Sequence, residues 1–294
     1  MAHTISRIFL TGASGFLGGY VLNALADHDL LGTVHSQPVA KAPKPLLGLD
    51  LTDADKTRAL LDEFNPDCII HTAAISNLDA CEKEPERARA VNVKSTEVLA
   101  EWAGTHTARL IFLSSEMVFD GRKTKYTEDT PPLPMSVYGQ TKVEAETHVL
   151  QLDRGVVLRS ALQFGVPLFG GTSFLMWMLE RLENNQSAPL FIDQYRSPIW
   201  ARNLVDLIIE LIDHDFSGIL NAGGANRIDR FSFGLQVCDT GGFDAGRLEP
   251  TSMFDNPHVA PRPQDVSLDI SKTQALLTTP ILTTNEALQR IFKS

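Results

Sequence analysis

The chain has 294 residues, of which 43% are hydrophobic and 21% are charged, and its formal net charge is −10. This acidic balance argues against a protein that binds nucleic acid or an anionic membrane surface. The three cysteines form no C-x-x-C pair, which indicates reduced thiols, and no apolar run is long enough for a membrane helix. We therefore expect a cytoplasmic protein built as one large domain or as two lobes.

Apolar runs and amphipathic segments alternate through the first half of the chain. The predicted strands are residues 7–12, 30–36, 47–53, 67–74, 108–115 and 155–161. The predicted helices are residues 17–28, 53–66, 87–106 and 136–152. Near-continuous apolar strands separated by helices are typical of a parallel sheet that is covered on both faces. The pattern therefore predicts an α/β fold with a doubly wound parallel sheet.

The second half of the chain is less regular. Helical spacing covers residues 169–185 and 203–215, and residues 189–200 between them read as a strand followed by a loop. We place the boundary between two lobes at the end of the sixth predicted strand. The first lobe is then residues 1–160, with some later segments returning to it, and residues 161–294 form mainly a smaller second lobe.

A glycine-rich loop, TGASGFLG, joins the first predicted strand to the first predicted helix. Gly12 permits a tight turn, Gly15 lets the backbone approach a pyrophosphate, and Gly18 lets the helix lie close to the sheet. The helix N-terminus then presents free N–H groups to phosphates. The alternative is a strand-turn-helix unit in which glycine serves packing alone. The position of the loop favours dinucleotide binding, with contacts from Gly12, Ser14, Gly15, Phe16, Leu17 and Gly18.

A tyrosine and a lysine four residues apart, Tyr138 and Lys142 in YGQTK, lie at the start of the helix predicted after the fifth strand. Residues i and i+4 project from one helix face. An ammonium group beside a phenol favours the phenolate and lowers the pKa of the tyrosine. The pair can then exchange a proton with a substrate, whereas the alternative is a solvated helix surface.

The glycine spacing together with YGQTK resembles the extended short-chain dehydrogenase/reductase family. The resemblance implies that residues 1–160 form a Rossmann-type NAD(P)-binding domain and that residues 161–294 form a substrate-binding lobe. It also implies that the tyrosine and the lysine are catalytic and contact the cofactor. Ser115, with Ser114 as its neighbouring alternative, would bond the substrate carbonyl oxygen. Asn92 would hold a proton-relay water, or else only pack within its helix.

The residues after the second predicted strand bear on the form of the cofactor. His35 and Ser36 stand where an acidic residue would bond the ribose 2′-hydroxyl of NAD(H). A carboxylate there would repel a 2′-phosphate, so its absence favours NADP(H), with His35 and Ser36 as candidate contacts. The family resemblance adds the cofactor contacts Asp50, Leu51, Thr72, Ala73 and Ala74.

Four segments, SSEMVFDG, YGQTKVEAE, DQYRSPIWARNLVD and RPQDVSLDISK, resemble the dTDP-4-dehydrorhamnose reductase-like branch of that family. The resemblance implies reduction of a nucleoside-diphosphate 4-keto-6-deoxysugar at C4. Two departures predict a different or looser sugar pocket: Ser115-Glu116-Met117 replaces Thr-Asp-Tyr, and Leu162 replaces a tryptophan. Glu116 keeps an acid that can bond sugar hydroxyls. Arg262 can meet a diphosphate as a bidentate donor or form a structural ion pair.

Two other functions stay open. One is a sugar-nucleotide epimerase, which retains its cofactor through the catalytic cycle. The other is a cofactor-binding regulatory subunit that resembles the regulatory subunit of methionine adenosyltransferase. The intact set of Ser115, Tyr138 and Lys142 favours an enzyme. We expect a sugar nucleotide as the small-molecule partner, and no nucleic acid, membrane or metal, because the histidines lack metal-site spacing. A homodimer stays open.

Overall fold

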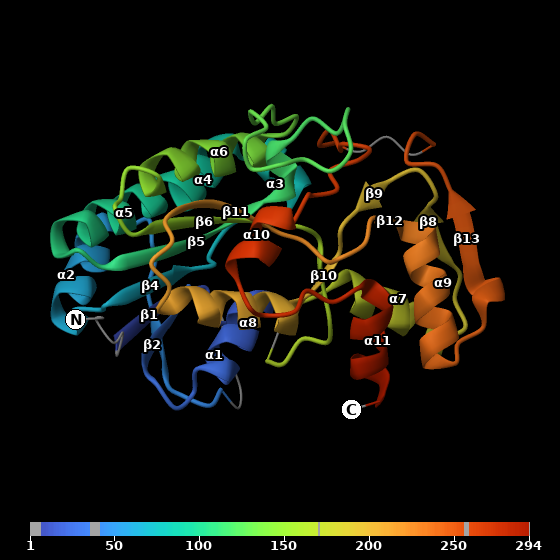
Figure 1. Cartoon of the computed structure of the whole chain (residues 1–294), viewed down its shortest axis with the longest axis horizontal. Coiled ribbons are helices and arrows are strands. Elements are labelled where there is room, and N and C mark those ends of the chain that lie inside the picture. Colours follow the sequence, from blue (N-terminus) through green and yellow to red (C-terminus); the bar gives the residue numbers. More distant parts are fainter. Residues whose placement is uncertain (1–6, 36–41, 170, 256–258, 294) are drawn as a thin grey trace.

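The computed structural model describes residues 7–35, 42–169, 171–255 and 259–293, and its central element is a seven-stranded parallel sheet (Figure 1). The strand order is β11-β6-β5-β4-β1-β2-β3. The strands are β1 Arg7–Thr11, β2 Asp29–Val34, β3 Leu46–Gly48, β4 Cys68–His71, β5 Arg109–Ser115, β6 Gly155–Ser160 and β11 Gly218–Ala222. The predicted α/β fold with a doubly wound parallel sheet is therefore confirmed.

The strand order reverses at β1. The chain builds outward through β2 to β3 and then crosses back, so that β4, β5, β6 and β11 follow on the other side of β1. In open parallel sheets, ligands bind outside the carboxyl ends of the strands at such a reversal. Thr11 at the end of β1 pairs in register with His71 at the end of β4. The reversal therefore brings the glycine loop after β1 beside the loop after β4.

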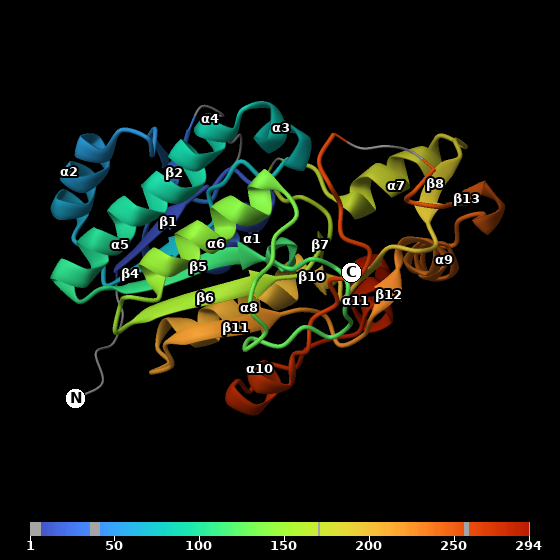
Figure 2. The same cartoon turned by 90° about the horizontal axis from the view of Figure 1, so that it is seen from above.

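Alternating side chains build an apolar core on each face of the sheet. One face is covered by α1 (Phe16–Ala24) and α8 (Ala201–Ile212), and the other by α2 (Ala54–Phe64), α5 (Ser95–His106) and α6 (Val137–Val149). Ile8 and Leu10 of β1 pack toward the first face, whereas Phe9 packs toward the second. Figure 2 shows α5 and α6 lying over the strands of the sheet.

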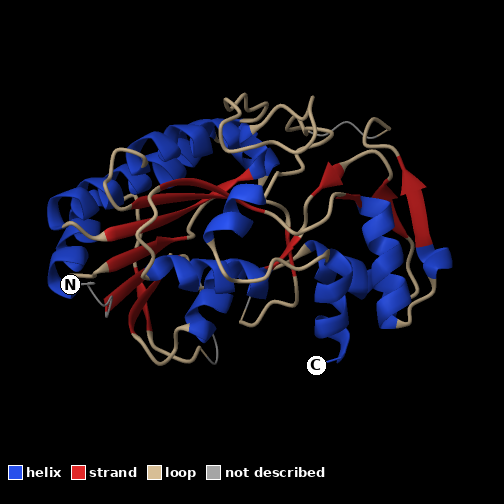
Figure 3. Cartoon of the chain, viewed as in Figure 1, coloured by secondary structure: helices blue, strands red, loops and turns tan. Residues whose placement is uncertain are grey.

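A smaller lobe of helices and short strands lies beside the sheet (Figure 3). It contains α7 (Phe174–Glu183), β8 (Ala188–Phe191), α9 (Arg230–Gly241), β13 (Leu248–Thr251) and α11 (Thr284–Lys293). Phe164, Met178 and Phe233 belong to the apolar cluster that these elements bury. Two-residue strands connect the lobes: β7 (Gln163–Phe164) pairs with β10 (Ile199–Trp200), and β9 (Tyr195–Arg196) pairs with β12 (Ile228–Asp229).

Two segments from the second half of the chain, α8 and β11, pack into the sheet lobe. The exact division of the chain at residue 160 stays a prediction. Within the described residues, no helix combines the length and the apolar character needed to cross a membrane.

The structure differs from the predicted helix 87–106. That segment contains the end of α4 (Pro85–Arg89), a π-helical turn at Ala90–Lys94, and α5. The π turn is only five residues long, which is too short for hydrophobic spacing to distinguish it from an α-helix. Sequence reasoning also missed α3 (Leu78–Lys83), α9, α10 (Ser271–Leu276), α11 and the 3₁₀ turns Glu116–Val118 and Ala245–Arg247. Most of these are short, and tertiary packing rather than a long periodic pattern stabilises them.

Candidate functional site

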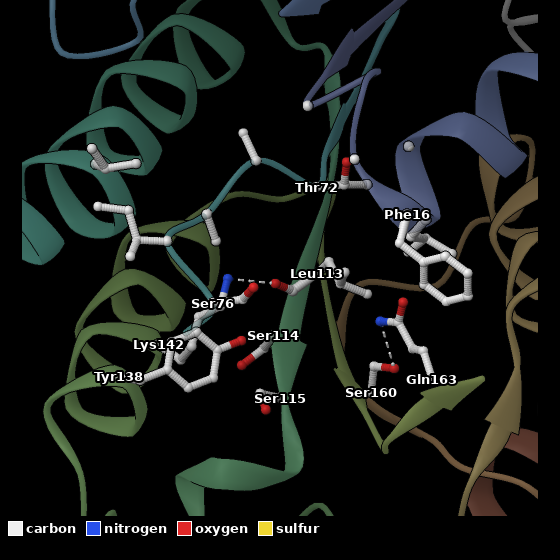
Figure 4. Close-up of a pocket in the computed structure, with 18 of the residues that line it drawn as sticks. Phe16, Thr72, Ser76, Leu113, Ser114, Ser115, Tyr138, Lys142, Ser160 and Gln163 are labelled. Carbon is white, nitrogen blue, oxygen red and sulfur yellow. Dashed lines mark hydrogen bonds between the residues drawn. The ribbon is translucent and has the colours of Figure 1, made fainter. Parts of the chain in front are cut away.

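A cleft of about 1070 Å³ opens at the carboxyl ends of the strands (Figure 4). One wall carries the glycine loop, the loop after β4, the end of β5 and the start of α6, and the other carries residues of β9 and α9. Among the predicted site residues that the structure describes, all but Asn92 line this cleft. They are Gly12, Ser14, Gly15, Phe16, Leu17, Gly18, His35, Asp50, Leu51, Thr72, Ala73, Ala74, Ser115, Glu116, Met117, Tyr138, Lys142, Leu162 and Arg262. Ser36 lies outside the described residues.

The glycine loop leaves no room for side chains at two positions. Gly12 has a φ of +72°, and a Cβ there would lie 2.8 Å from Ala73 N. A Cβ on Gly18 would lie 2.0 Å from the Gly12 carbonyl oxygen, so α1 starts directly against the loop. Helix α1 has no side-chain cap, and the first N–H groups of a helix lack intrahelical partners. The loop therefore fits the phosphates of a dinucleotide.

The end of β3 supplies a carboxylate to the same cleft. Asp50 accepts hydrogen bonds from Thr52 Oγ1 and Thr52 N at 2.7 and 2.9 Å, and these bonds hold the pKa of Asp50 below its ordinary value. One Asp50 carboxylate oxygen lies 3.7 Å from His35 Nε2. His35, the residue that follows β2, thus faces the carboxylate of Asp50 at the end of the neighbouring strand β3.

Helix α6 carries Tyr138 and Lys142 one turn apart on its buried face. The Lys142 ammonium group donates a hydrogen bond to the Leu113 carbonyl oxygen of β5 at 2.8 Å. It lies 5.9 Å from the centre of the Tyr138 ring. In Figure 4 both side chains extend from α6 toward the end of β5, where Ser115 lies. The tyrosine, the lysine and the serine of the predicted catalytic set therefore meet in one part of the cleft.

Burial dominates the ionisation of this pair. It raises the pKa of Tyr138 to about 12, although a hydrogen bond with Ser115 opposes the shift. It lowers the pKa of Lys142 to about 7, although the Glu146 carboxylate opposes that shift. The expected lowering of the tyrosine pKa is therefore wrong for this structure, because desolvation of the phenol is the larger effect. The site holds a protonated phenol beside an amine that titrates near neutral pH.

One turn further along α6, a buried ion pair joins this helix to β6. The Glu146 carboxylate accepts hydrogen bonds from Arg159 Nε and Nη2 at 3.1 and 2.8 Å. The two side chains are only 3% and 2% exposed. Ser114 Oγ donates a third hydrogen bond to Glu146 at 2.6 Å. Of the two adjacent serines, Ser114 is thus engaged with Glu146, whereas Ser115 is the one that bonds Tyr138.

Asn92 lies in the π-helical turn, away from the cleft lining. Its Oδ1 accepts a hydrogen bond from Ile75 N at 2.8 Å. Its Nδ2 donates to Ile75 O and to Thr141 Oγ1, both at 3.1 Å. The amide therefore ties the loop after β4 to α6. The proton-relay role of Asn92 stays a prediction.

Glu116 forms a buried ion pair with Arg196 across the cleft, with 3.1 Å between Oε1 and Nε. The remaining guanidinium nitrogens of Arg196 donate to the carbonyl oxygens of Tyr195, Pro263 and Gln264 at 2.6 to 3.2 Å. The second carboxylate oxygen, Oε2, is buried and has no hydrogen-bond partner among the described residues. Burial raises the pKa of Glu116 to about 7, against the attraction of Arg196.

Two further arginines line the second wall. Arg262 Nη2 lies 3.6 Å from Asp79 Oδ2, so the structural ion pair left open by the sequence is present. Arg230, at the start of α9, donates from Nε to Gln194 Oε1 at 3.1 Å, and its buried Nη1 lacks a partner in the described part of the chain. Sequence reasoning missed Arg230 because no apolar pattern predicted α9. No motif in the sequence marks this position.

The sequence matches the family model of the RmlD substrate binding domain over residues 6–294. The chain belongs to this family. The predicted resemblance to the dTDP-4-dehydrorhamnose reductase-like branch is thereby confirmed, because that match spans nearly the whole chain. A solved structure of a hypothetical dTDP-4-dehydrorhamnose reductase from Sulfolobus tokodaii agrees with it, at a TM-score of 0.84 and 30% identity over 94% of this chain and 97% of that chain.

Proteins similar to this chain carry different names. A probable low-salt glycan biosynthesis reductase of Haloferax volcanii, Agl14, is 33% identical over 278 residues, which are 92% of this chain and 91% of the relative. Methionine adenosyltransferase 2 subunit beta of Xenopus tropicalis is 31% identical over 280 residues, which are 92% of this chain and 82% of the relative. The proteins similar to this chain thus include both proteins named as reductases and a protein named as a subunit of another enzyme.

Two glutamates of α6 pair with arginines, Glu146 with Arg159 and Glu144 with Arg89, and they should contribute differently to the free energy of unfolding. We expect Glu146→Ala to lower the free energy of unfolding by about 3–5 kcal/mol, because it leaves Arg159 buried without a counter-charge. Glu144→Ala removes a half-exposed ion pair with Arg89 and should cost less than about 1 kcal/mol. Urea unfolding of both variants measures the difference, and equal costs would contradict the buried pair.

Proposed function

We propose that this RmlD-family protein is an NAD(P)H-dependent reductase of a nucleoside-diphosphate 4-keto-6-deoxysugar. The observation that carries the proposal is that Tyr138, Lys142 and Ser115 share one cleft with the glycine loop. One end of the cleft suits a dinucleotide and the other suits proton transfer to a carbonyl oxygen. The names of the reductases among its relatives support the same reaction type.

Tyr138 is the proton donor in this reaction. When bound, a dihydronicotinamide cofactor supplies the hydride that reduces the carbonyl carbon. The Tyr138 hydroxyl gives its proton to the carbonyl oxygen, so that the ketone becomes a secondary alcohol. The Ser115 hydroxyl donates a hydrogen bond to the same oxygen and stabilises the negative charge that develops there. The Lys142 ammonium group favours the phenolate that Tyr138 becomes and anchors the nicotinamide ribose.

The second wall of the cleft supports an anionic substrate. Arg196, Arg230 and Arg262 line it, and Glu116 is paired with the first of them. This local positive charge lies within a chain whose net charge is −10. Arg230 and Arg262 are the candidates for contact with a diphosphate. The unpartnered Glu116 Oε2 accepts a hydrogen bond from a sugar hydroxyl, while Met117 and Leu162 shape the sugar pocket.

A cofactor-binding regulatory subunit is the second candidate, because methionine adenosyltransferase 2 subunit beta is among the relatives. A regulatory protein needs the glycine loop but not a proton donor. The presence of Tyr138, Lys142 and Ser115 together in the cleft favours the reductase.

The catalytic proposal is tested by NADPH oxidation with a panel of nucleoside-diphosphate 4-keto-6-deoxysugars. We expect turnover with at least one of them and a loss of kcat of about 100-fold or more in Tyr138→Phe, since a general acid contributes about 10²–10⁴-fold. Tyr126→Phe is the matched control, because Tyr126 is also buried but bonds Asp120 and does not line the cleft. Failure of the whole panel would overturn the reductase. Cofactor retained through purification, with interconversion of two sugar nucleotides, would indicate the epimerase instead.

Two kinetic constants of the reduction, kcat and the substrate KM, should each change with pH near neutral pH. The Lys142 ammonium is present below its pKa of about 7 and is lost above it, so kcat should fall as the pH rises. The Glu116 carboxylate is present above its pKa of about 7 and is lost below it, so the substrate KM should rise as the pH falls. Lys142→Met should remove the pH dependence of kcat, and Glu116→Gln should remove the pH dependence of KM. Wild-type profiles in both variants would refute these assignments.

We propose that the cofactor is NADP(H) rather than NAD(H). The residue that follows β2 is His35 rather than a carboxylate that would bond a ribose 2′-hydroxyl and repel a 2′-phosphate, and the Asp50 carboxylate of the neighbouring strand end faces this imidazole at 3.7 Å. Isothermal titration should therefore give NADPH a Kd about tenfold or more below that of NADH, a difference of roughly 1.4 kcal/mol. His35→Asp should reverse the order. Equal affinities for the two cofactors in the wild-type protein would contradict the preference.

A further inference from the structure

A line of buried hydrogen bonds runs behind the glycine loop. Thr11, the last residue of β1, lies 2.6 Å from His71 Nδ1 through its Oγ1. The other ring nitrogen of His71, Nε2, lies 3.0 Å from Thr96 Oγ1 of α5. All three side chains are at most 1% exposed. They have no part in the proposed reaction, so their polar groups need another explanation.

The neighbours of the two threonines fix which ring nitrogen carries the proton. Thr96 Oγ1 donates its hydrogen to Asn92 O at 2.8 Å, so it can only accept from His71, and Nε2 must carry the proton. Nδ1 is then an acceptor, and Thr11 Oγ1 donates to it. The Thr11 hydroxyl in turn accepts from Ala73 N at 3.3 Å. Each hydrogen bond in the line therefore has one defined donor and one defined acceptor.

The line joins the two loops that form the floor of the cofactor end of the cleft. Ala73 belongs to the loop after β4, and Gly12 directly follows Thr11 in the glycine loop. A Cβ on Gly12 would lie only 2.8 Å from Ala73 N, so the loops are in close contact. Thr72 adds a bond from its Oγ1 to Thr11 O at 2.7 Å. The relative position of the loops thus depends on Thr11, and the orientation of its hydroxyl depends on His71.

Charge on the imidazole would disturb the neighbouring catalytic lysine. The centre of the His71 ring lies 5.6 Å from the centre of the Phe112 ring. Lys142 Nζ of α6 lies 4.5 Å from the centre of the Phe112 ring. Burial lowers the pKa of His71 to about 3, and the positive charge of Lys142 acts in the same direction. The imidazole is therefore neutral across the physiological range and remains an acceptor at Nδ1.

We propose that His71, in its neutral Nε2–H form, is a positioning residue that sets the glycine loop and the loop after β4 at the spacing a dinucleotide requires. The inference rests on the proposed function only in that the cleft binds a dinucleotide. His71 is not among the residues that line the cleft, and it acts through Thr11 and Ala73.

Isosteric and length-matched variants separate this role from general stability. Thr11→Val keeps the shape of the side chain but removes both the donor to His71 Nδ1 and the acceptor for Ala73 N. The side chain of His71→Asn reaches as far as Nδ1 and can still accept from Thr11, whereas that of His71→Gln reaches as far as Nε2 and can bond only Thr96. Thr57→Val is the matched control, because Thr57 is a fully buried threonine on α2 that bonds only its own helix.

We expect the NADPH Kd, measured by isothermal titration, to rise about tenfold or more in Thr11→Val and His71→Gln, and by less than about threefold in His71→Asn and Thr57→Val. Melting temperatures of the cofactor-free proteins serve as the stability readout. Thr11→Val should lower the melting temperature more than Thr57→Val, because it leaves His71 Nδ1 and Ala73 N without partners, whereas Asp53 O still accepts from Thr57 N. Ring ¹⁵N NMR of the wild-type histidines should show His71 as the Nε2–H tautomer at every pH from about 5 to about 9.

Wild-type affinity in Thr11→Val would overturn the proposal, as would an imidazolium or an Nδ1–H tautomer at residue 71. These readouts remain available if the His71 variants fail to fold, because one uses an isosteric threonine variant and the other the unmodified protein. Absence of dinucleotide binding by the wild-type protein would overturn both this inference and the proposed function. Dinucleotide binding without turnover of any sugar would overturn the reductase alone.

Discussion

Helix α6 buries three ionisable side chains on successive turns of one face, and the site is organised by the need to give each of them a partner. Lys142 bonds a β5 carbonyl oxygen, Tyr138 bonds the serine that ends β5, and Glu146 pairs with Arg159 of β6. Ser114 and Arg159 are opposite each other in the β5–β6 register, which is why both reach the same carboxylate. The close approach that these bonds need is possible because residue 139 is glycine: a Cβ there would lie 2.3 Å from the Met117 carbonyl oxygen.

The second lobe completes the cleft through one arginine that holds several segments together. Arg196 connects Glu116, at the end of β5, with the carbonyl oxygens of residues 263 and 264, directly after Arg262. Its guanidinium therefore serves the protein itself, whereas Arg230 keeps a buried nitrogen without a partner in the described part of the chain. The two arginines on this wall therefore have different roles. Arg196 positions an acid and a loop, whereas Arg230 keeps a guanidinium nitrogen that can still donate a hydrogen bond to an anion.

The first six strands of the sheet were predictable because local and global signals agree there, whereas the seventh strand, β11, was not predicted. Every strand from β1 to β6 is mainly apolar and overlaps its predicted range, and the glycines and the tyrosine–lysine pair each have fixed spacing within one short segment. The partners of these residues were not predictable. Arg159 lies within an apolar strand, and His71 and Thr96 are 25 residues apart and meet only because α5 packs on β4. Arg230 opens a helix without amphipathic spacing. A sequence motif identifies residues that are close together in the sequence. Burial and hydrogen-bond partners depend on packing between elements, so a motif does not predict them.

The cost of burying Lys142 bears on the choice between a catalyst and a binding protein. Its pKa in the folded protein is about 7, so at neutral pH the unfolded chain holds the proton more tightly than the folded one, and this difference opposes folding. A methionine or leucine would fill the same apolar space without that cost. Binding a dinucleotide at the glycine loop needs no amine at this position. Groups that oppose folding are characteristic of functional sites, where activity rather than stability selects the residue. The buried amine beside a protonated phenol therefore supports the proposed proton transfer, because the architecture of the fold does not require either group.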